Sequence, residues 1–210
     1  MCGVVGIIGK KNASSLVLEG LKKLEYRGYD SAGIASFHQE AIQVAKSEGK
    51  LVNLIDKVND LTKDNIYCDT SIALGHTRWA THGNINIKNA HPLTSENRVA
   101  VVHNGIIENY ASIKKTLETE GYVFVSQTDT EVLPHLFTKY LKKGHDFLQA
   151  GRLVLKDIKG AFAFVAICLD VPDQLFVSRN SSPLAIGLGE GSNFVGSDAQ
   201  SINHLTNKIM

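Results

Sequence analysis

The chain opens with MCGVVGIIG, residues 1–9, in which a cysteine leads into an apolar run interrupted by glycines. This run predicts a buried strand over residues 2–9, which would hold the start of the chain in place instead of leaving it to fray. Met1 is expected to be removed, because the cysteine that follows it is small. Cys2 would then carry both a thiol and a free α-amine, whose unperturbed pKa is roughly 7.7–8.0.

An amine of that pKa can act as a base near neutral pH, on the same residue as a thiol nucleophile. A lone cysteine at position two more often has no such role. The buried strand that follows Cys2 favours the catalytic interpretation, because it would fix the thiol on a rigid element.

Beyond this first strand, the pattern predicts strands in groups, with helices mostly between the groups. Further strands are expected at residues 31–37, 41–47, 71–76, 98–103, 161–169, 174–178, 184–188 and 193–196. Helices are expected at residues 13–25, 51–58, 106–120, 129–143 and 146–156. Residues 81–95 read as a long loop, and a loop of that length inside a compact domain is usually functional. The grouping indicates an α+β fold with antiparallel sheets covered by helices.

The alternation of large and small residues in AFAFVAI, residues 161–167, predicts a strand packed on both faces. The glycines at 187, 189 and 191 lack the helix that follows a dinucleotide-binding loop, so they indicate a turn between strands.

The composition is that of one globular domain of 210 residues, 43% of them hydrophobic. Lys and Arg number 22 against 21 Asp and Glu, and no basic block is present, which argues against binding to nucleic acid or to an anionic membrane. No signal peptide or membrane-spanning run is apparent. The three cysteines are widely spaced, which argues against a disulfide framework and for a cytoplasmic location.

A first polar group is GHTRWATHG, residues 75–83, at the end of a predicted strand. Arg78 offers a planar, permanently charged fork that suits a carboxylate. For an isolated arginine, a surface salt bridge is the more frequent role. Trp79 is the only tryptophan, and a lone tryptophan more often lies in a core than in a lid.

A second group is HNG, residues 103–105, which closes a predicted strand. The Asn104 amide and the Gly105 N–H would be neighbouring donors able to bind the oxyanion formed when a thiolate attacks an amide. The dipeptide alone favours a tight turn. Because residues 106–110 read as the start of a helix and not as a returning strand, we expect a functional corner here.

A third group is QTDTE, residues 127–131. Thr128 and Glu131 fit a helix capping box, and Asp129 would then complement the helix dipole. A carboxylate at position 129 could equally pair with the ammonium group of a ligand. The sequence alone leaves these alternatives open.

Four histidines, His76, His82, His91 and His103, fall in one third of the chain, which raises the possibility of a metal-dependent hydrolase. No HExxH and no paired CxxC motif accompanies them. No metal and no cofactor are therefore expected.

Taken together, these stretches resemble the glutaminase domain of the glutamine–fructose-6-phosphate aminotransferases, also called glucosamine-6-phosphate synthases. That domain belongs to the class II, or N-terminal-nucleophile, glutamine amidotransferases. The similar stretches are residues 2–6, 24–33, 75–83, 89–92, 102–109, 128–132 and 179–184. The selective one is YRGYDSAG, residues 26–33, because phosphoribosyl-transferring relatives differ around its Arg-Gly pair.

The resemblance implies a four-layer α/β/β/α sandwich and hydrolysis of L-glutamine through a γ-glutamyl thioester on Cys2. Asn104 and Gly105 would form the oxyanion hole. The roles implied for the remaining site residues are support of the nucleophile by Arg27, glutamine binding by Arg78, Asp129, Thr81 and His82, gating of ammonia by Trp79, and communication with the acceptor domain by His91.

The resemblance also implies what the chain leaves out. Residues 1–210 would be a glutaminase domain, truncated near its C-terminal end and lacking the sugar-isomerase domains that bind fructose 6-phosphate. The full-length protein would be a cytoplasmic homodimer. Two alternatives are the glutaminase domain of another class II enzyme, such as an amidophosphoribosyltransferase, and a glutamine-binding module without catalysis.

Overall fold

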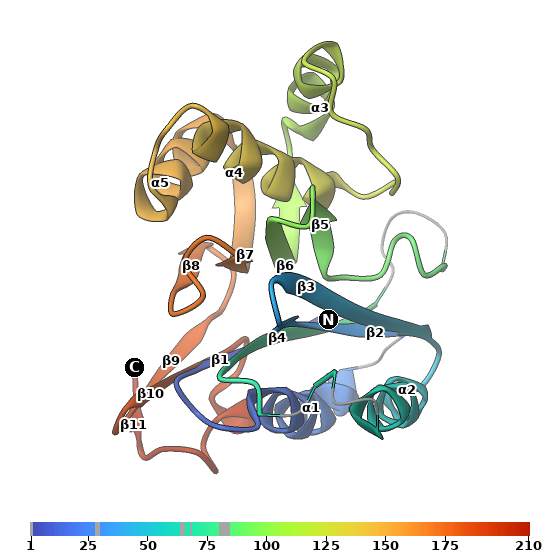
Figure 1. Cartoon of the computed structure of the whole chain (residues 1–210), viewed down its shortest axis with the longest axis vertical. Helices are drawn as coiled ribbons and strands as arrows, with labels where there is room; N and C mark the ends of the chain where they lie inside the picture. The colour runs from blue at the N-terminus through green and yellow to red at the C-terminus, as the bar shows by residue number, and fades with distance from the viewer. Residues whose placement is uncertain (1, 28–29, 64–65, 68, 80–84) are drawn as a thin grey trace.

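The computed structural model describes residues 2–27, 30–63, 66–67, 69–79 and 85–210, and the strands of these residues form two antiparallel sheets (Figure 1). The larger sheet has the strand order β11-β9-β10-β1-β4-β2-β3. Its strands are β1 (Gly3–Ile8), β2 (Ser31–His38), β3 (Ala41–Glu48), β4 (Ile72–Arg78), β9 (Ala185–Gly189), β10 (Ser192–Gly196) and β11 (Lys208–Ile209). The smaller sheet, in the order β5-β6-β7-β8, comprises β5 (Leu93–Ser95), β6 (Val99–Ile107), β7 (Gly160–Cys168) and β8 (Leu175–Asn180).

Helices cover the outer face of each sheet. In Figure 1, α1 (Ala13–Leu24) and α2 (Leu51–Lys63) lie under the larger sheet, while α4 (Val132–Lys142) and α5 (Phe147–Asp157) lie against the smaller one. The remaining helix is α3 (Tyr110–Thr119), and short 3-10 turns occur at η1 (Glu25–Arg27), η2 (Asp129–Glu131) and η3 (Ala199–Ser201). The predicted α+β fold and its four layers, α/β/β/α, are confirmed.

Strand alternation explains why the layers hold together. On β1, Val4 packs between the two sheets, whereas Val5 and Ile7 pack against the helices under the larger sheet. Successive side chains of a strand point to opposite faces, so a strand that is apolar at every position must be covered on both.

The same argument holds for β7, where the predicted packing on both faces is confirmed. Phe162 and Phe164 enter the core under α4 and α5, while Val165 and Ile167 enter the core between the sheets.

The main errors of the sequence prediction lie where pairing between distant segments decides the structure. Strand β6 does not stop at His103 but continues to Ile107, and the helix expected from residue 106 begins at Tyr110. The ladder with β7, which reaches the pair Ile107 and Gly160, extends the strand past the predicted corner.

The predicted loop 81–95 contains β5, which pairs with β6, and β11 was not predicted at all. Both strands are very short, so neither shows a period of its own. Within the described residues, no helix has the length and apolar character needed to cross a membrane.

Candidate active site

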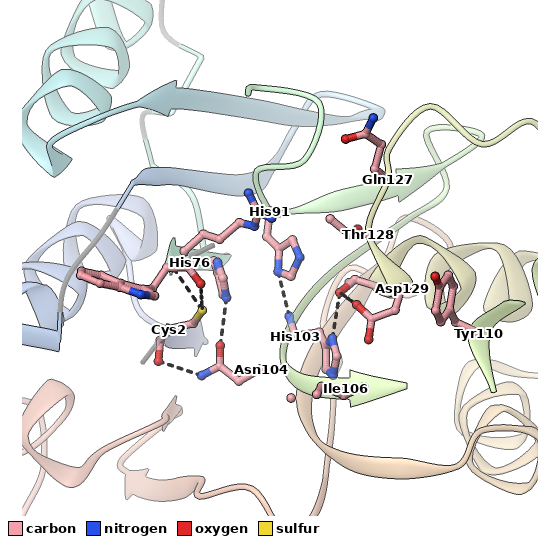
Figure 2. Close-up of a pocket in the computed structure, with 14 residues that line it drawn as sticks. Cys2, His76, His91, His103, Asn104, Ile106, Tyr110, Gln127, Thr128 and Asp129 are labelled. Atoms are coloured by element: carbon pink, nitrogen blue, oxygen red, sulfur yellow. Dashed lines mark hydrogen bonds between the residues drawn. The ribbon is translucent and has the colours of Figure 1, made fainter. Parts of the chain in front are cut away.

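Cys2 directly precedes β1 and lies beside the end of β4, because Gly3 is paired with Thr77 (Figure 2). The Trp79 backbone N–H donates to Cys2 Sγ at 3.2 Å, and Sγ is 3.6 Å from the Trp79 carbonyl oxygen. Burial raises the pKa of the Cys2 thiol, while the Trp79 hydrogen bond and the nearby Arg78 guanidinium oppose that rise. The side chain is half-buried, so the thiol is both fixed in position and open to the cavity described next.

A cavity of about 190 Å³ opens where β1, β4 and β6 meet η2. A single water needs about 10–15 Å³, so this space is large enough for a small organic molecule. The predicted site residues that line it are Cys2, Arg78, Trp79, His91, Asn104, Gly105 and Asp129. Thr81 and His82 lie outside the described residues, as does the side chain of Arg27, whose backbone forms the end of η1.

Asn104 connects β6 to the nucleophile. Its Nδ2 donates to the Cys2 carbonyl oxygen at 3.0 Å, and its Oδ1 is 2.9 Å from Nε2 of His76 (Figure 2). The next residue, Gly105, has φ +120°, and a Cβ there would come within 2.1 Å of the Ala161 carbonyl oxygen. Position 105 therefore requires glycine because of its conformation and the close approach of β7.

Opposite charges line the same cavity. Arg78 is only 5% exposed, so the surface salt bridge considered from the sequence is wrong. Asp129 accepts a hydrogen bond from the Ile107 backbone N–H at 2.6 Å, which anchors its carboxylate to β6. A fixed cation and a fixed anion in one small cavity can hold the two charged groups of an amino acid.

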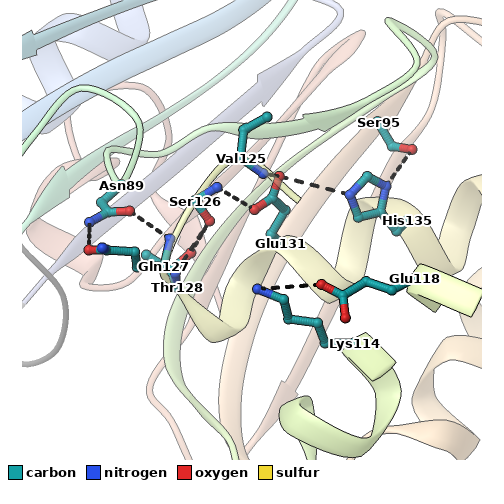
Figure 3. A network of polar contacts seen from close by, with 10 residues as sticks. All are labelled: Asn89, Ser95, Lys114, Glu118, Val125, Ser126, Gln127, Thr128, Glu131 and His135. Atoms are coloured by element: carbon teal, nitrogen blue, oxygen red, sulfur yellow. Dashed lines mark hydrogen bonds and ion pairs between the residues drawn. The ribbon is translucent and has the colours of Figure 1, made fainter. Parts of the chain in front are cut away.

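The capping box that the sequence offered as one alternative for Thr128 and Glu131 is not formed. Thr128 makes no side-chain cap. Glu131 is buried and instead accepts from the backbone N–H groups of Val125 at 2.9 Å and Ser126 at 2.7 Å (Figure 3). The two backbone N–H groups, of which that of Ser126 is buried, hold this carboxylate away from the helix end.

Gln127, which the sequence did not single out, is held in the cavity wall by an amide pair. The Gln127 backbone N–H donates to Asn89 Oδ1 at 2.8 Å, and Asn89 Nδ2 donates to Gln127 Oε1 at 3.2 Å (Figure 3). The pair joins the segment that carries His91 to the segment that carries Asp129.

Trp79 is 51% exposed at the cavity mouth, so the core position expected for a lone tryptophan is wrong. Its backbone holds the thiol, while its ring is left free to contact a bound molecule. Exposed Ile106 and Tyr110 also line the cavity and were missed by the sequence prediction. The alternation of a strand could have found Ile106, because it lies two residues after Asn104 on β6.

Three histidines of the described part of the chain form a stack in the wall of the cavity: His76, His91 and His103. The ring centroids of His76 and His91 are 4.2 Å apart, and those of His91 and His103 are 6.4 Å apart. Burial lowers the pKa of His76 to about 3, that of His103 to about 4, and that of His91 well below its ordinary value.

The stack is therefore neutral near pH 7, and hydrogen bonds connect it to its surroundings. His103 Nδ1 lies 2.8 Å from Thr130 Oγ1, and the His103 backbone N–H donates to His91 Nδ1 at 3.3 Å. Among the residues that the structure describes, no group of three His, Cys, Asp or Glu side chains is arranged to hold a metal ion.

A protein-family model described as "Glutamine amidotransferase domain" matches residues 41–209. The chain belongs to this family. Glutamine–fructose-6-phosphate aminotransferase [isomerizing] of Clostridium tetani is 47% identical over the whole chain, and the enzyme of that name from Thermococcus kodakarensis is 44% identical. The chain spans about a third of these relatives, 33% and 34% of their lengths.

Among solved structures, this amidotransferase domain is similar to a glutamine phosphoribosylpyrophosphate amidotransferase from B. subtilis, with a TM-score of 0.79 and 30% identity. The match covers 96% of this chain and 43% of that one. These comparisons confirm the resemblance seen in the sequence, and with it the sandwich fold of the N-terminal-nucleophile hydrolases.

Proposed function

We propose that the chain is the glutaminase domain of a glutamine–fructose-6-phosphate aminotransferase. It would hydrolyse the side-chain amide of L-glutamine to glutamate and ammonia, and the longer protein would transfer the ammonia to fructose 6-phosphate. The observation that carries the proposal is the cavity itself, which is lined by a thiol, a side-chain amide donor, a buried arginine and an anchored aspartate.

The chemistry follows from the neighbours of the thiol. After removal of Met1, the α-amine of Cys2 would take the thiol proton, and Sγ would attack the amide carbon of glutamine. Asn104 Nδ2 and the Gly105 N–H would bind the oxyanion of the tetrahedral intermediate, where one such donor is typically worth ~10²–10³ in rate. The amine would return the proton to the leaving ammonia, and water would then hydrolyse the thioester.

Recognition of glutamine would rest on the charged pair. Arg78 would bind the α-carboxylate and Asp129 the α-ammonium, with Thr81 and His82 lining the same pocket. Arg27 would support the nucleophile. Trp79, at the mouth, would gate the departure of ammonia, and His91 would communicate with the acceptor domain.

The choice of acceptor is supported by sequence identity. The aminotransferase relatives are 44% and 47% identical to the chain, against 30% for the phosphoribosyl enzyme. The acceptor itself, the cytoplasmic location and a homodimeric full-length protein belong to this proposal. A glutamine-binding module without catalysis would keep Arg78 and Asp129 but would need no thiol beside the Asn104 amide.

The test is release of glutamate from L-glutamine by protein whose N-terminus has been checked by intact mass. Release is expected only from molecules that begin at Cys2, because retained Met1 places the α-amine on the wrong residue. Turnover by protein with intact Met1 would contradict the role of the amine. Binding of glutamine without any release from the clipped protein would support the binding module instead.

Asp129→Asn is expected to raise the KM for glutamine by roughly 30-fold, about 2 kcal/mol, with a smaller change in kcat. The asparagine can still accept the hydrogen bond from Ile107, so the fold is kept while the charge that faces the ammonium is lost. Steady-state kinetics measures the effect, and Asp146→Asn, at the exposed N-cap of α5, is the matched control. An unchanged KM would mean that Asp129 serves only the helix end.

A further inference from the structure

We propose that His76 is a positioning residue for the reaction, because it locks the Asn104 amide in the one orientation that presents Nδ2–H to the oxyanion. The inference rests on the proposed function and adds a residue to it. His76 does not touch the reacting atoms and would act only through Asn104.

The hydrogen bonds of Asn104 fix the orientation of its side-chain amide. An asparagine amide offers one acceptor oxygen and one NH₂ donor. The group facing the Cys2 carbonyl oxygen at 3.0 Å must be Nδ2, because an oxygen there would meet another oxygen with no hydrogen between them. Oδ1 therefore faces His76 and can only accept, so the imidazole must carry its hydrogen on Nε2.

The imidazole is suited to this task because it is held on several sides. His76 lies within β4 and is 1% exposed. One face of its ring packs on His91, at 4.2 Å between centroids, and His91 in turn accepts from the backbone of β6. Burial keeps the ring neutral, so it carries a single N–H, and Nε2 lies 2.9 Å from the acceptor oxygen of Asn104.

The second hydrogen of Nδ2 is the one that matters for catalysis. One hydrogen serves the Cys2 carbonyl, and the other remains for the cavity that Asn104 and Cys2 both line. The terminal torsion of an asparagine is broad and roughly two-fold, so without an anchor on Oδ1 the amide can rotate away. The effect should be smaller than the ~10²–10³ of losing the donor outright.

His76→Leu removes the N–H at similar size, and His76→Gln supplies an amide N–H in its place. We expect the leucine variant to lose roughly 10- to 100-fold in kcat for glutamine hydrolysis, with KM changed less than about threefold. The glutamine variant should recover most of the loss. If the leucine variant does not fold, His76→Met takes its place as the variant without a donor.

A double-mutant cycle with Asn104→Ala separates positioning from a general structural role. If His76 acts through Asn104, replacing His76 in the Asn104→Ala background should lower kcat by no more than about twofold. The inference is overturned if the loss persists in that background or if the leucine variant has the kcat of wild type. In either case, glutamine turnover by the wild-type protein would still support the proposed function. A correctly clipped wild-type protein that binds but does not hydrolyse glutamine overturns both.

Discussion

Cys2→Ser is expected to lower glutamine hydrolysis by on the order of 10³-fold or more and to leave glutamine binding largely intact. A serine hydroxyl is hard to ionise near pH 7, whereas a cysteine has a measurable thiolate fraction. Burial raises the pKa of the Cys2 thiol, so even the thiol depends on the α-amine for its activation. The same α-amine would deprotonate a serine hydroxyl far less readily than a thiol.

The serine variant should still bind glutamine, because the groups proposed to hold glutamine belong to other residues than Cys2. Arg78 lies at the end of β4, and Asp129 is anchored to the Ile107 N–H of β6, so neither depends on the sulfur atom. Calorimetry with glutamine measures the binding and glutamate release measures the rate. Cys168→Ala is the matched control, since Cys168 is a buried thiol of β7 that does not line the cavity. Turnover by the serine variant close to that of wild type would refute the nucleophile assignment.

The fold could be predicted where a single strand carries its own signal. Residues 161–167 show on their own that both faces of β7 are buried, because large and small apolar side chains alternate without a polar face. The same holds for the run after Cys2. Strand β5 has no such signal, because its three residues become a strand only by pairing with β6.

The candidate site residues could be named from the sequence, but their arrangement could not. Cys2 stood out from its own chemistry, whereas the roles expected for Arg78 and Asp129 came from the resemblance. The contact of His76 with Asn104 joins residues that are 28 positions apart and depends on how β4 and β6 face each other across the two sheets. Neither the sequence around His76 nor that around Asn104 reveals this contact on its own. The period of two, which places His76 on the same face of β4 as Arg78, was the available clue.

Glu131 shows why a local pattern can mislead. Its spacing from Thr128 matches a capping box, but the backbone of residues 125–126 is left without regular pairing and needs acceptors. A buried N–H without a partner is more unfavourable than an uncapped helix end near the surface. The need of the backbone N–H groups for an acceptor therefore determines where the Glu131 carboxylate lies. These groups belong to residues 125–126, which the capping-box motif does not include.

The histidine stack is expected to make the folded protein unstable to mild acid. In the folded state His76 and His103 have pKa values of about 3 and 4, because burial disfavours the charged ring. In the unfolded chain each has a pKa near 6.5. Between these limits the unfolded state binds protons that the folded state does not, so stability falls as the pH falls from about 6.5 toward 4.

The size of the effect follows from the same linkage. Each such histidine contributes a slope that approaches about 1.4 kcal/mol per pH unit, or about 2 kcal/mol between pH 7 and pH 5. His91 shifts in the same direction, so the stack can remove a large part of the roughly 5–15 kcal/mol of an ordinary domain.

Urea unfolding at pH 7 and at pH 5 measures this loss directly. His103→Gln should reduce the difference in unfolding free energy between the two pH values by about 2 kcal/mol, because it removes one titrating group. Equal stability of the wild-type protein at the two pH values would mean that the buried rings take up protons in the folded state, and that the cavity opens to water more readily than its packing indicates.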